Sequence, residues 1–492
     1  MGLRTADEYR DSLRDGRRVV YRGELVEDVT SHPSLERTID HAAGLFEHPD
    51  QGPEGFWSYH DEALGEEVSS FFLRPTDRET LRRRGDVIEE ATRRARSTLN
   101  IVKAVGTDAL LGLEQAVAPL DREQGTAYGE RIRAFRDHCA RGDLAMVLAA
   151  TDAKGDRTLA PAGQEDPDLY LRIVGRDEDG ITVRGAKLHT TAAPSANEMI
   201  CIPCRAMTED DGDYALAFAV PLNAPGLTLI SHPLVDGHAA EHPVSSRNIE
   251  VETLTVFEDV RIPWERVFLC GEWRHAGAVA GAFANFHRYT AISYKPPFVD
   301  VMIGAAALAA DQIGLLRSSA MREKLGKLIV YGELIRTARL AAAERCRIDP
   351  LTGIAVPDSV ANNAGKYHFS SNFHEAVAIL QDIAGGLTVT APGLEDVEDP
   401  DFGPMIEKYL AGRQGVGGGE RWRLIELIRD ITASEFGGYN YVVTLHGEGS
   451  QGAQLVQTVR DYDLAGRIDL VRTILDGGVP LDDAAKLKEL AG

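Results

Sequence analysis

The chain has 492 residues, 43% of them hydrophobic and 26% charged, and its formal net charge is −23. This length exceeds what one compact core holds, so two or three domains are expected in an ordinary globular protein. The acidic balance argues against nucleic acid and anionic membranes as partners, because both bind basic surfaces.

Helical patterns dominate the first 150 residues. Charged, amphipathic stretches at 79–96 and 126–149 repeat with the period of a helix. The first residues are charged and lack the basic-then-apolar pattern of a secretory signal. These features predict an N-terminal helical domain over residues 1–150 and a cytoplasmic protein.

Short alternating runs follow from residue 151. Turn-forming residues separate them, which predicts a middle antiparallel β domain over residues 151–272. The predicted strands lie at 170–174, 181–184, 215–220 and 251–257.

The helical period returns after residue 272 and predicts a C-terminal helical bundle over residues 273–492. Its long apolar segments lie at 299–316, 322–343 and 424–436. The first of these contains Asp300 and Asp311, which favours a core helix over a membrane span. The glycine-rich run at 412–419 lacks the Lys-Ser/Thr ending of a phosphate loop, so we expect a connection between helices.

Cysteine usage indicates a reducing compartment. Five cysteines in a chain of this length provide no disulfide framework. Cys201 and Cys204 have the spacing of a redox pair, but they sit in a strand-like run with no second pair or histidine set nearby. We interpret them as structural residues at a strand end.

The most informative stretch runs from residue 151 to residue 204. It opens with Thr151-Asp152-Ala153-Lys154-Gly155-Asp156-Arg157 and later contains Lys187-Leu188-His189-Thr190-Thr191. Small, polar and β-branched residues at strand ends suit a flat, polar ligand edge, because their backbone groups approach closely.

Four segments in this order and spacing carry a resemblance: 9–17, 151–191, 257–267 and 445–454. Together they resemble the 4-hydroxyphenylacetate 3-hydroxylase and 4-hydroxybutyryl-CoA dehydratase family of flavoproteins. The resemblance implies an α+β, acyl-CoA dehydrogenase-like fold: an N-terminal helical domain, a middle antiparallel β domain and a C-terminal helical bundle.

The resemblance also implies FAD as cofactor. Asp152, Lys154, Arg157, Thr190 and Thr191 fall where the family binds FAD. The two cations suit the pyrophosphate, and the threonines can donate to the edge of the flavin ring. The alternative interpretation of 154–157 is a charged hairpin tip.

A second FAD segment is implied near the C-terminus. Its residues are His446, Gly447, Gly449, Ser450 and Gln454, in a pattern typical of a helix start, where free N–H groups attract anions. In this fold the corresponding loop often reaches FAD bound to a neighbouring subunit, which implies a homo-oligomer, a dimer or a tetramer. The alternative is that the glycines only form a turn.

The segment 286–295 separates the two branches of the family. In the dehydratase branch a histidine and three cysteines hold a [4Fe–4S] cluster. This chain keeps His287, but Tyr294 stands at the third cysteine, and the Cys-x3-Cys pair maps near Asn100 and Ala104. An iron–sulfur cluster needs thiolates, so none is expected here, nor any other metal. The phenol-binding residues of the hydroxylase branch, which map near 100–104 and Leu148, are absent too.

Four residues are the predicted catalytic groups. His287, placed beside the flavin by the resemblance, would orient the substrate, and Arg288 or Lys295 would balance negative charge. Glu252 falls near an active-site carboxylate of the dehydratase branch. A glutamate buried there would be a base with a raised pKa; an outward strand residue is the equal alternative.

Three functions follow, in order. The first is an FAD-dependent monooxygenase that uses O₂ and FADH₂ to hydroxylate a small organic, preferentially aromatic, substrate. A separate reductase would supply the FADH₂, since the chain has no NAD(P)H-binding Gly-x-Gly-x-x-Gly unit. The second is a cluster-free relative of the dehydratase, an isomerase or lyase for an acyl-CoA, with Glu252 and His287 as base and acid. The third is a flavin-binding protein without catalysis.

Overall fold

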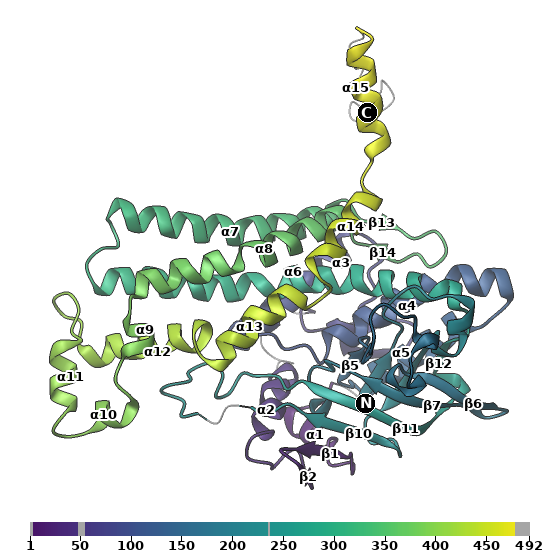
Figure 1. Cartoon of the computed structure of the whole chain (residues 1–492), viewed down its shortest axis with the longest axis horizontal. Coiled ribbons are helices and arrows are strands. Elements are labelled where there is room, and N and C mark those ends of the chain that lie inside the picture. The colour runs from purple at the N-terminus through teal and green to yellow at the C-terminus, as the bar shows by residue number, and fades with distance from the viewer. Residues whose placement is uncertain (1–2, 48–54, 235–236, 478–492) are drawn as a thin grey trace.

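Two β-sheets lie on one side of a set of long helices in the computed structural model of the chain, which describes residues 3–47, 55–234 and 237–477 (Figure 1). The last fifteen residues of the predicted C-terminal bundle therefore lie outside the described part. None of the helices within these ranges is long and apolar enough to cross a membrane.

The N-terminal third mixes helices with short strands. The helices are α1 (Ala6–Asp11), α2 (Glu36–Ala43), α3 (Arg78–Arg94), α4 (Ala104–Gln124) and α5 (Tyr128–Arg141). The strands are β1 (Val19–Tyr21), β2 (Glu24–Val26), β3 (Ser58–Asp61), β4 (Glu66–Ser69) and β5 (Met146–Ala149). The predicted helix at 79–96 is confirmed by α3.

The middle of the chain supplies most of the sheet strands, as predicted. These are β6 (Arg172–Asp177), β7 (Gly180–Lys187), β8 (Glu198–Cys201), β9 (Leu216–Pro221), β10 (Leu227–Ser231), β11 (Thr253–Pro263) and β12 (Val267–Cys270). One sheet has the order β2-β1-β10-β11-β7-β6 and the other β12-β9-β8-β5.

Both sheets recruit strands from the N-terminal third, which the sequence did not predict. β1 pairs in parallel with β10, and β5 pairs in parallel with β8. The predicted helix at 126–149 is therefore wrong at its end: α5 stops at Arg141, and Met146–Ala149 form a strand. The apolar run at 144–149 is too short to show a period, so its pairing with β8 decides its conformation. The domain limits at 150 and 272 stay a prediction.

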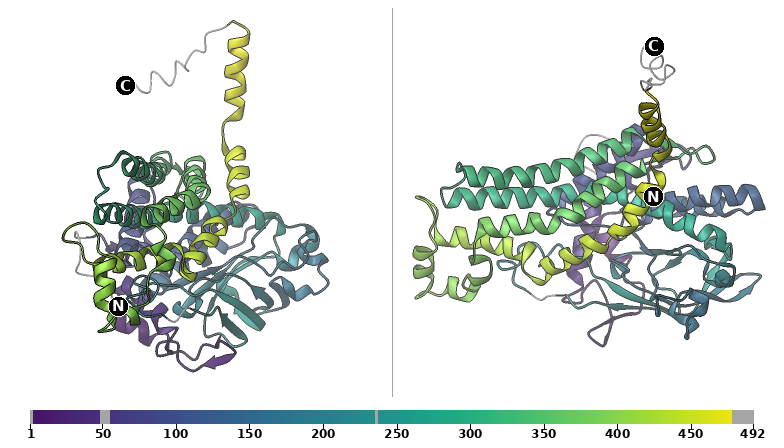
Figure 2. Two further views of the ribbon diagram at one scale, coloured as in Figure 1. Left: turned by 60° about the vertical axis from the view of Figure 1, so that its left-hand side comes forward. Right: turned by 45° about the horizontal axis from the view of Figure 1, so that its top comes forward.

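Long helices make up the rest of the chain, as predicted: α6 (Trp273–Gln312), α7 (Ser319–Glu344), α8 (Ser359–Ala384), α9 (Leu387–Thr390), α10 (Leu394–Glu398), α11 (Gly403–Tyr409), α12 (Gly418–Thr432), α13 (Glu435–His446), α14 (Gln451–Asp461) and α15 (Leu464–Leu475). Two short strands, β13 (Arg347–Ile348) and β14 (Ala355–Val356), form a hairpin between α7 and α8. The glycine-rich run at 412–419 connects α11 to α12, as expected. Figure 2 shows α15 standing clear of the other helices.

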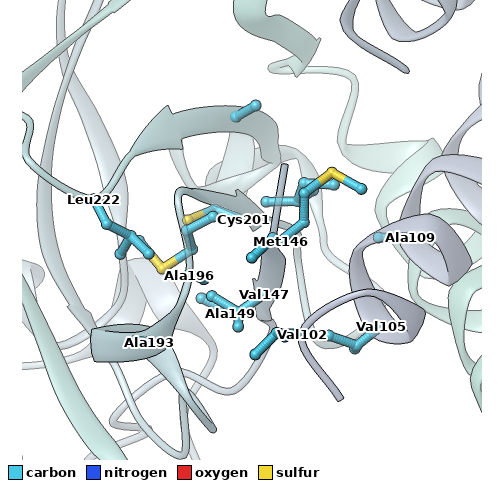
Figure 3. Close-up of a cluster of buried hydrophobic side chains, with 14 of the residues drawn as sticks. Val102, Val105, Ala109, Met146, Val147, Ala149, Ala193, Ala196, Cys201 and Leu222 are labelled. Carbon is cyan, nitrogen blue, oxygen red and sulfur yellow. The ribbon is translucent and has the colours of Figure 1, made fainter. Parts of the chain in front are cut away.

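A continuous apolar core joins α4 to the smaller sheet. Val102, Val105 and Ala109 face Met146 and Val147 of β5 (Figure 3). A Cβ on Gly106 would lie 2.2 Å from the Cβ of Met146, so the close approach of α4 to β5 requires glycine. Cys201 lies in the same core, as expected for a structural cysteine, and burial raises the pKa of its thiol.

A buried ion pair fixes the start of α4. Lys103 Nζ donates to both carboxylate oxygens of Asp143, at 2.8 and 2.9 Å, and lies over the ring of Phe46. Both charged side chains are 2% exposed. Because a buried charge is costly without its partner, this pair holds the loop before β5 against α4.

Replacing Asp143 with Asn should lower the free energy of unfolding by about 3–5 kcal/mol, because Lys103 would keep its buried charge and lose its counterion. The matched control is Glu344→Gln, since Glu344 pairs with Arg78 on the surface, where a pair contributes less than about 1 kcal/mol. Urea unfolding of both variants measures the difference. Equal losses in the two variants would contradict the expected role of burial.

Candidate active site

A cavity of about 70 Å³ lies among α6, α8, α13 and the segments 97–99 and 248–250. Its apolar wall is made by four phenylalanines, Phe298, Phe369, Phe373 and Phe436. Its polar lining comes from Ser97, Thr98, Asn248, Glu250, Tyr294, Lys295, Tyr439, Asn440 and Thr444. An apolar cavity with a few convergent polar groups is the usual form of a small-molecule site.

Lys295 and Tyr294 stand at one end of this cavity and share a single carboxylate. Lys295 Nζ donates to Tyr294 Oη at 3.0 Å and to Glu448 Oε1 at 3.2 Å. The Tyr294 hydroxyl also donates to Glu448 Oε1. Lys366 of α8 contacts the other oxygen, Glu448 Oε2, at 3.3 Å. The loop after α13 is thereby joined to α6 and α8.

Burial perturbs the protonation of this cluster. It raises the pKa of Glu448 to about 8, although the Arg288 guanidinium opposes the rise. It lowers the pKa of Lys366 to about 7, helped by the positive charge of Arg288. Burial and the nearby Lys366 also bring the pKa of Lys295 well below its ordinary value. Groups of this kind exchange protons near neutral pH, as acid–base catalysts must.

The side chain of Arg288 binds the backbone of the same loop. Its Nε donates to the carbonyl of Glu448 at 2.9 Å, and its Nη1 donates to Asn363 Oδ1 at 2.9 Å. Gly449 has φ +94°, and a Cβ there would lie 2.7 Å from Arg288 Nη2. Gln454 Nε2 donates to the carbonyl of Gly449 at 2.7 Å. The structure therefore brings together the predicted residues Arg288, Lys295, Gly449 and Gln454.

The predicted helix start at 446–450 is confirmed. α13 ends at His446, which is exposed, and Gly447 N–H donates to the carbonyl of Val443. Ser450 caps α14 by accepting from the N–H of Ala453. The side chain of Glu448 turns inward to its own chain, so the reach of this loop to a neighbouring subunit stays a prediction.

Glu252 links the β-sheet to α13. Its carboxylate accepts from the Thr191 hydroxyl at 2.9 Å and from the Tyr439 hydroxyl at 2.7 Å. Burial raises the pKa of Tyr439 well above its ordinary value, and the carboxyls of Glu252 and Glu250 add to the rise. Glu252 thus points to a neighbouring helix and is not an outward strand residue.

Glu250 lines the cavity two residues before Glu252. Its Oε1 accepts from the N–H of Ile101 at 2.7 Å, while Oε2 has no hydrogen-bond partner within the described residues. The side chain is 9% exposed, and burial raises its pKa well above the ordinary value. Glu250 therefore presents to the cavity a carboxyl group whose charged form is disfavoured by burial.

The first predicted FAD segment begins beside the end of β7. Asp152 bridges to Lys187, and Leu188 N–H donates to the carbonyl of Thr151 at 2.7 Å. The Asp152 carboxylate is occupied by Lys187 Nζ at 2.7 Å inside the protein. The Thr190 hydroxyl accepts from Thr255 and has no exposed surface. These two side chains are engaged within the protein and support the loop.

Lys154 and Arg157 are the accessible members of that segment. Arg157 is exposed, and Lys154 is half-buried with a positive φ of 70°. Thr191 is half-buried and donates to Glu252. Cations suit a pyrophosphate and a hydroxyl suits a polar ring edge, so these residue types fit FAD.

His287 faces away from the cavity lining. Its Nδ1 lies 3.1 Å from Asp108 Oδ2, and its ring stacks on Phe283. The fully buried Asp108 also accepts from Arg84 Nη2 at 2.6 Å and from the Thr290 hydroxyl at 2.8 Å. The structure therefore separates His287 from Lys295, and it orients the imidazole through Asp108.

The donors around His287 do not fit an iron–sulfur cluster. Asn100 Nδ2 donates to the carbonyl of His41 at 2.6 Å, and Ala104 is buried in the core. The hydroxyl of Tyr294 is engaged by Glu448. These three residues offer no thiolate, which is the ligand that such clusters require.

Sequence reasoning missed several residues of this site: Glu448, Lys366, Glu250, Tyr439 and Asn440. Glu448 stands inside the segment 446–450 and had a usable signal, a charged residue between two glycines. Tyr439 and Asn440 lie on α13, whose sequence has the pattern of an ordinary apolar helix. Lys366 lies on α8, and no motif marks it.

The two halves of the chain match the two halves of one protein family. Residues 5–269 match the family described as 4-hydroxyphenylacetate 3-hydroxylase N terminal, and residues 276–476 match 4-hydroxyphenylacetate 3-hydroxylase C terminal. The chain therefore belongs to the 4-hydroxyphenylacetate 3-hydroxylase family, as its segments predicted.

Relatives come from both branches. The 4-hydroxybutyryl-CoA dehydratase/vinylacetyl-CoA-Delta-isomerase of Clostridium aminobutyricum is 31% identical over 96% of this chain and 99% of its own. The 4-hydroxyphenylacetate 3-monooxygenase oxygenase component of Thermus thermophilus is 32% identical, covering 88% of this chain and 89% of its own. A crystal structure of such an oxygenase component complexed with FAD covers 96% of this chain and 98% of its own, with 29% identity and a TM-score of 0.88.

A more distant solved structure also confirms the fold class. Glutaryl-coenzyme A dehydrogenase, at 13% identity, superimposes with a TM-score of 0.52 over 93% of each chain. The α+β, acyl-CoA dehydrogenase-like fold predicted from the sequence is therefore correct.

The carboxyl group of Glu448 should stay protonated until the pH rises through about 8, because burial raises its pKa from 4.5. Because the folded protein binds this proton more tightly than the unfolded chain does, the contribution of the group to the free energy of unfolding is complete below the unfolded pKa. It is lost as the pH rises through the folded pKa. The difference infrared spectrum between wild type and Glu448→Gln should show a protonated carboxyl band at pH 6 that disappears by pH 9.

The control for this measurement is Glu323→Gln on α7. The Glu323 side chain is 74% exposed and pairs with Lys327 on the same helix, so the same substitution there shows what an exposed glutamate contributes to the difference spectrum. Carboxylate bands for Glu448 at pH 6 would contradict the predicted shift.

Proposed function

We propose that this member of the 4-hydroxyphenylacetate 3-hydroxylase family is the oxygenase component of a flavin-dependent monooxygenase. It would take FADH₂ from a separate reductase and use O₂ to hydroxylate a small aromatic substrate. Support comes from the family match and from relatives named as oxygenase components. The cavity among α6, α8 and α13, with its phenylalanine wall, is the proposed substrate site.

One observation carries the choice between the two branches of the family. The positions near Asn100, Ala104 and Tyr294 hold no thiolate, and Tyr294 is bonded to Glu448 within the protein. A radical dehydratase depends on the cluster that such thiolates hold. We therefore propose that this chain carries no iron–sulfur cluster and no other metal.

The proposed FAD site uses residues that fit the cofactor. Lys154 and Arg157 would hold the pyrophosphate, and Thr191 together with the backbone after β7 would contact the ring edge. Asp152 and Thr190 would act from behind, by fixing the loop and strand end. Bound in its reduced form, FAD would supply electrons to O₂.

The residues of the chain itself would manage protons and water. The Tyr294 hydroxyl and Lys295 Nζ, both held by Glu448, are placed to give or take a proton at the cavity. Glu252, fixed by Thr191 and Tyr439, would hold the boundary between sheet and helix closed to water. His287 would act as a positioning residue, oriented by Asp108.

A second candidate is a cluster-free isomerase or lyase that acts on an acyl-CoA. The similarity to the Clostridium dehydratase supports it, and so do the carboxyl groups of Glu250, which lines the cavity, and of Glu448, which accepts from the lining residue Tyr294. In this case Glu252 would be the base, and Glu448 or His287 would be the acid. This chemistry needs no oxygen, which separates it from the first proposal.

We further propose a homo-oligomer, a dimer or a tetramer. α15 stands clear of the body (Figure 2), and α14 and α15 expose apolar side chains such as Val456, Val459 and Val471. Apolar surface of this kind is normally covered by another protein surface. A second copy of the chain that covers this apolar surface would bring its own 446–450 loop into the assembly.

Oxygen dependence tests the proposed activity. With chemically reduced FAD and a panel of phenols, wild-type protein should form product only when O₂ is present, and aerobic His287→Ala should convert more of the O₂ to hydrogen peroxide without losing FAD. The exposed His60 of β3 provides a matched control, since His60→Ala should behave as wild type. Product without O₂, or about four irons per chain, would overturn the proposal.

Replacing Gly449 with Ala should weaken FAD binding about tenfold. A side chain at φ +94° costs about 1–2 kcal/mol and would also displace Arg288. Gly452 in the first turn of α14 is the control, because a Cβ there meets nothing within 4 Å. Flavin fluorescence titration, with sedimentation of both variants, measures affinity and assembly. Equal FAD affinity in Gly449→Ala and Gly452→Ala would contradict the proposed role of this loop.

A further inference from the structure

The cavity contains polar atoms that the fold leaves without partners. Within the described residues, Glu250 Oε2, Asn248 Oδ1 and Asn440 Nδ2 have no hydrogen-bond partner, and all three residues line the cavity. A buried polar group without a partner costs about 1–3 kcal/mol, so such atoms are normally met by water or a ligand. Three of them at one cavity point to a bound polar group.

The three atoms differ in what they offer. Asn440 Nδ2 is a donor, and Asn248 Oδ1 is an acceptor. The assignment of Asn248 follows from its other contact, since its Nδ2 lies 3.2 Å from His41 Nδ1. Glu250 is nine-tenths buried, with Oε1 held by the N–H of Ile101. The ligand must therefore both accept and donate hydrogen bonds.

The charge of the lining restricts the ligand further. Lys295 is the cation of the cavity lining, and its Nζ is already shared between Tyr294 and Glu448. Glu250 brings a carboxyl group to the same space. A ligand carboxylate would meet no free countercharge there, which makes its burial costly.

The size of the cavity limits the ligand to about one ring. Its volume of about 70 Å³ is several times the roughly 10–15 Å³ that one water needs by a comparable measure. Phe298, Phe369 and Phe373 offer flat apolar surface to such a ring.

We propose that the cavity binds an uncharged aromatic ring carrying a carboxamide-like group, with Asn440 donating to its carbonyl and Asn248 accepting from its N–H. The ring lies against the phenylalanine wall. This inference rests on the proposed function, because the cavity is the substrate side of that site, and it names the chemical class of the substrate.

Three ligands of nearly equal shape test the proposal: benzamide, acetophenone and benzoate. Acetophenone lacks the N–H donors, and benzoate carries the charge. Calorimetric titration of the full-length protein with bound oxidised FAD should give at least tenfold tighter binding of benzamide than of either competitor. Equal or tighter binding of benzoate, or no binding of any of the three, overturns the proposal.

A variant pair locates the binding. Asn440→Leu should weaken benzamide and acetophenone by a similar factor of about tenfold, because both carry the carbonyl to which Asn440 Nδ2 donates in the proposal. Asn223→Leu is the matched control, since Asn223 is exposed in the turn before β10. Unchanged benzamide binding in Asn440→Leu overturns the assignment of the donor, and the comparison of the three ligands on wild type needs no variant to fold.

The outcome is separable from that of the proposed function. Calorimetry with oxidised FAD involves no turnover, so the preference for benzamide can fail while product formation with phenols still requires O₂. Conversely, turnover without O₂ would overturn the monooxygenase and leave the ligand preference standing.

Discussion

The carboxyl group of Glu448 is the constraint on which the site depends. It lies fully enclosed between Lys295 of α6 and Lys366 of α8, while Arg288 holds its backbone carbonyl. A charged or polar group that is buried in this way stabilises the fold only when every partner is in place. The loop between α13 and α14, which is far from α6 in sequence, therefore has one position against the two long helices. The polar end of the cavity is a consequence of that position.

The opposite side of the cavity depends on a second contact between distant segments. Tyr439 of α13 reaches Glu252, which Thr191 also holds, so one helix is tied to Glu448 at its end and to the sheet at its start. The sequence predicted the helices and strands themselves, because their periods of about 3.6 and 2 residues are local properties. It could not predict that β1 and β5 join sheets formed later in the chain, or that residues 144–149 become a strand, because pairing decides those segments.

The residues of the site fall into the same two groups: those marked by a local sequence pattern and those placed by contacts between distant segments. The segments 152–191 and 446–454 were recognisable because glycine, threonine and charged residues recur there in a fixed order, and the structure brings Arg288, Lys295, Gly449 and Gln454 together. His287 was expected beside them, yet Asp108 turns its imidazole toward α4. Neighbouring positions on a helix point in different directions, so closeness in sequence did not place both side chains at one cavity. Lys366 and Asn440 lie in ordinary helical patterns, and only the packing of α8 and α13 gives them a role.

The side chains of Asn100, Ala104 and Tyr294 contain no thiolate, and the polar groups beside Tyr294 determine what this part of the fold can do. In this chain Tyr294 donates to Glu448, and the pKa of that carboxyl rises to about 8 while that of Lys366 falls to about 7. The cluster therefore holds exchangeable protons close to neutrality. In the proposed oxygenase protons would move next to the cavity, and this buried set of carboxyl, ammonium and phenol groups would serve that purpose. The same burial raises the pKa of Glu250, so desolvation disfavours a charged carboxylate on the protein and on a ligand alike. Acid–base chemistry and the proposed charge of the substrate thus share one physical cause.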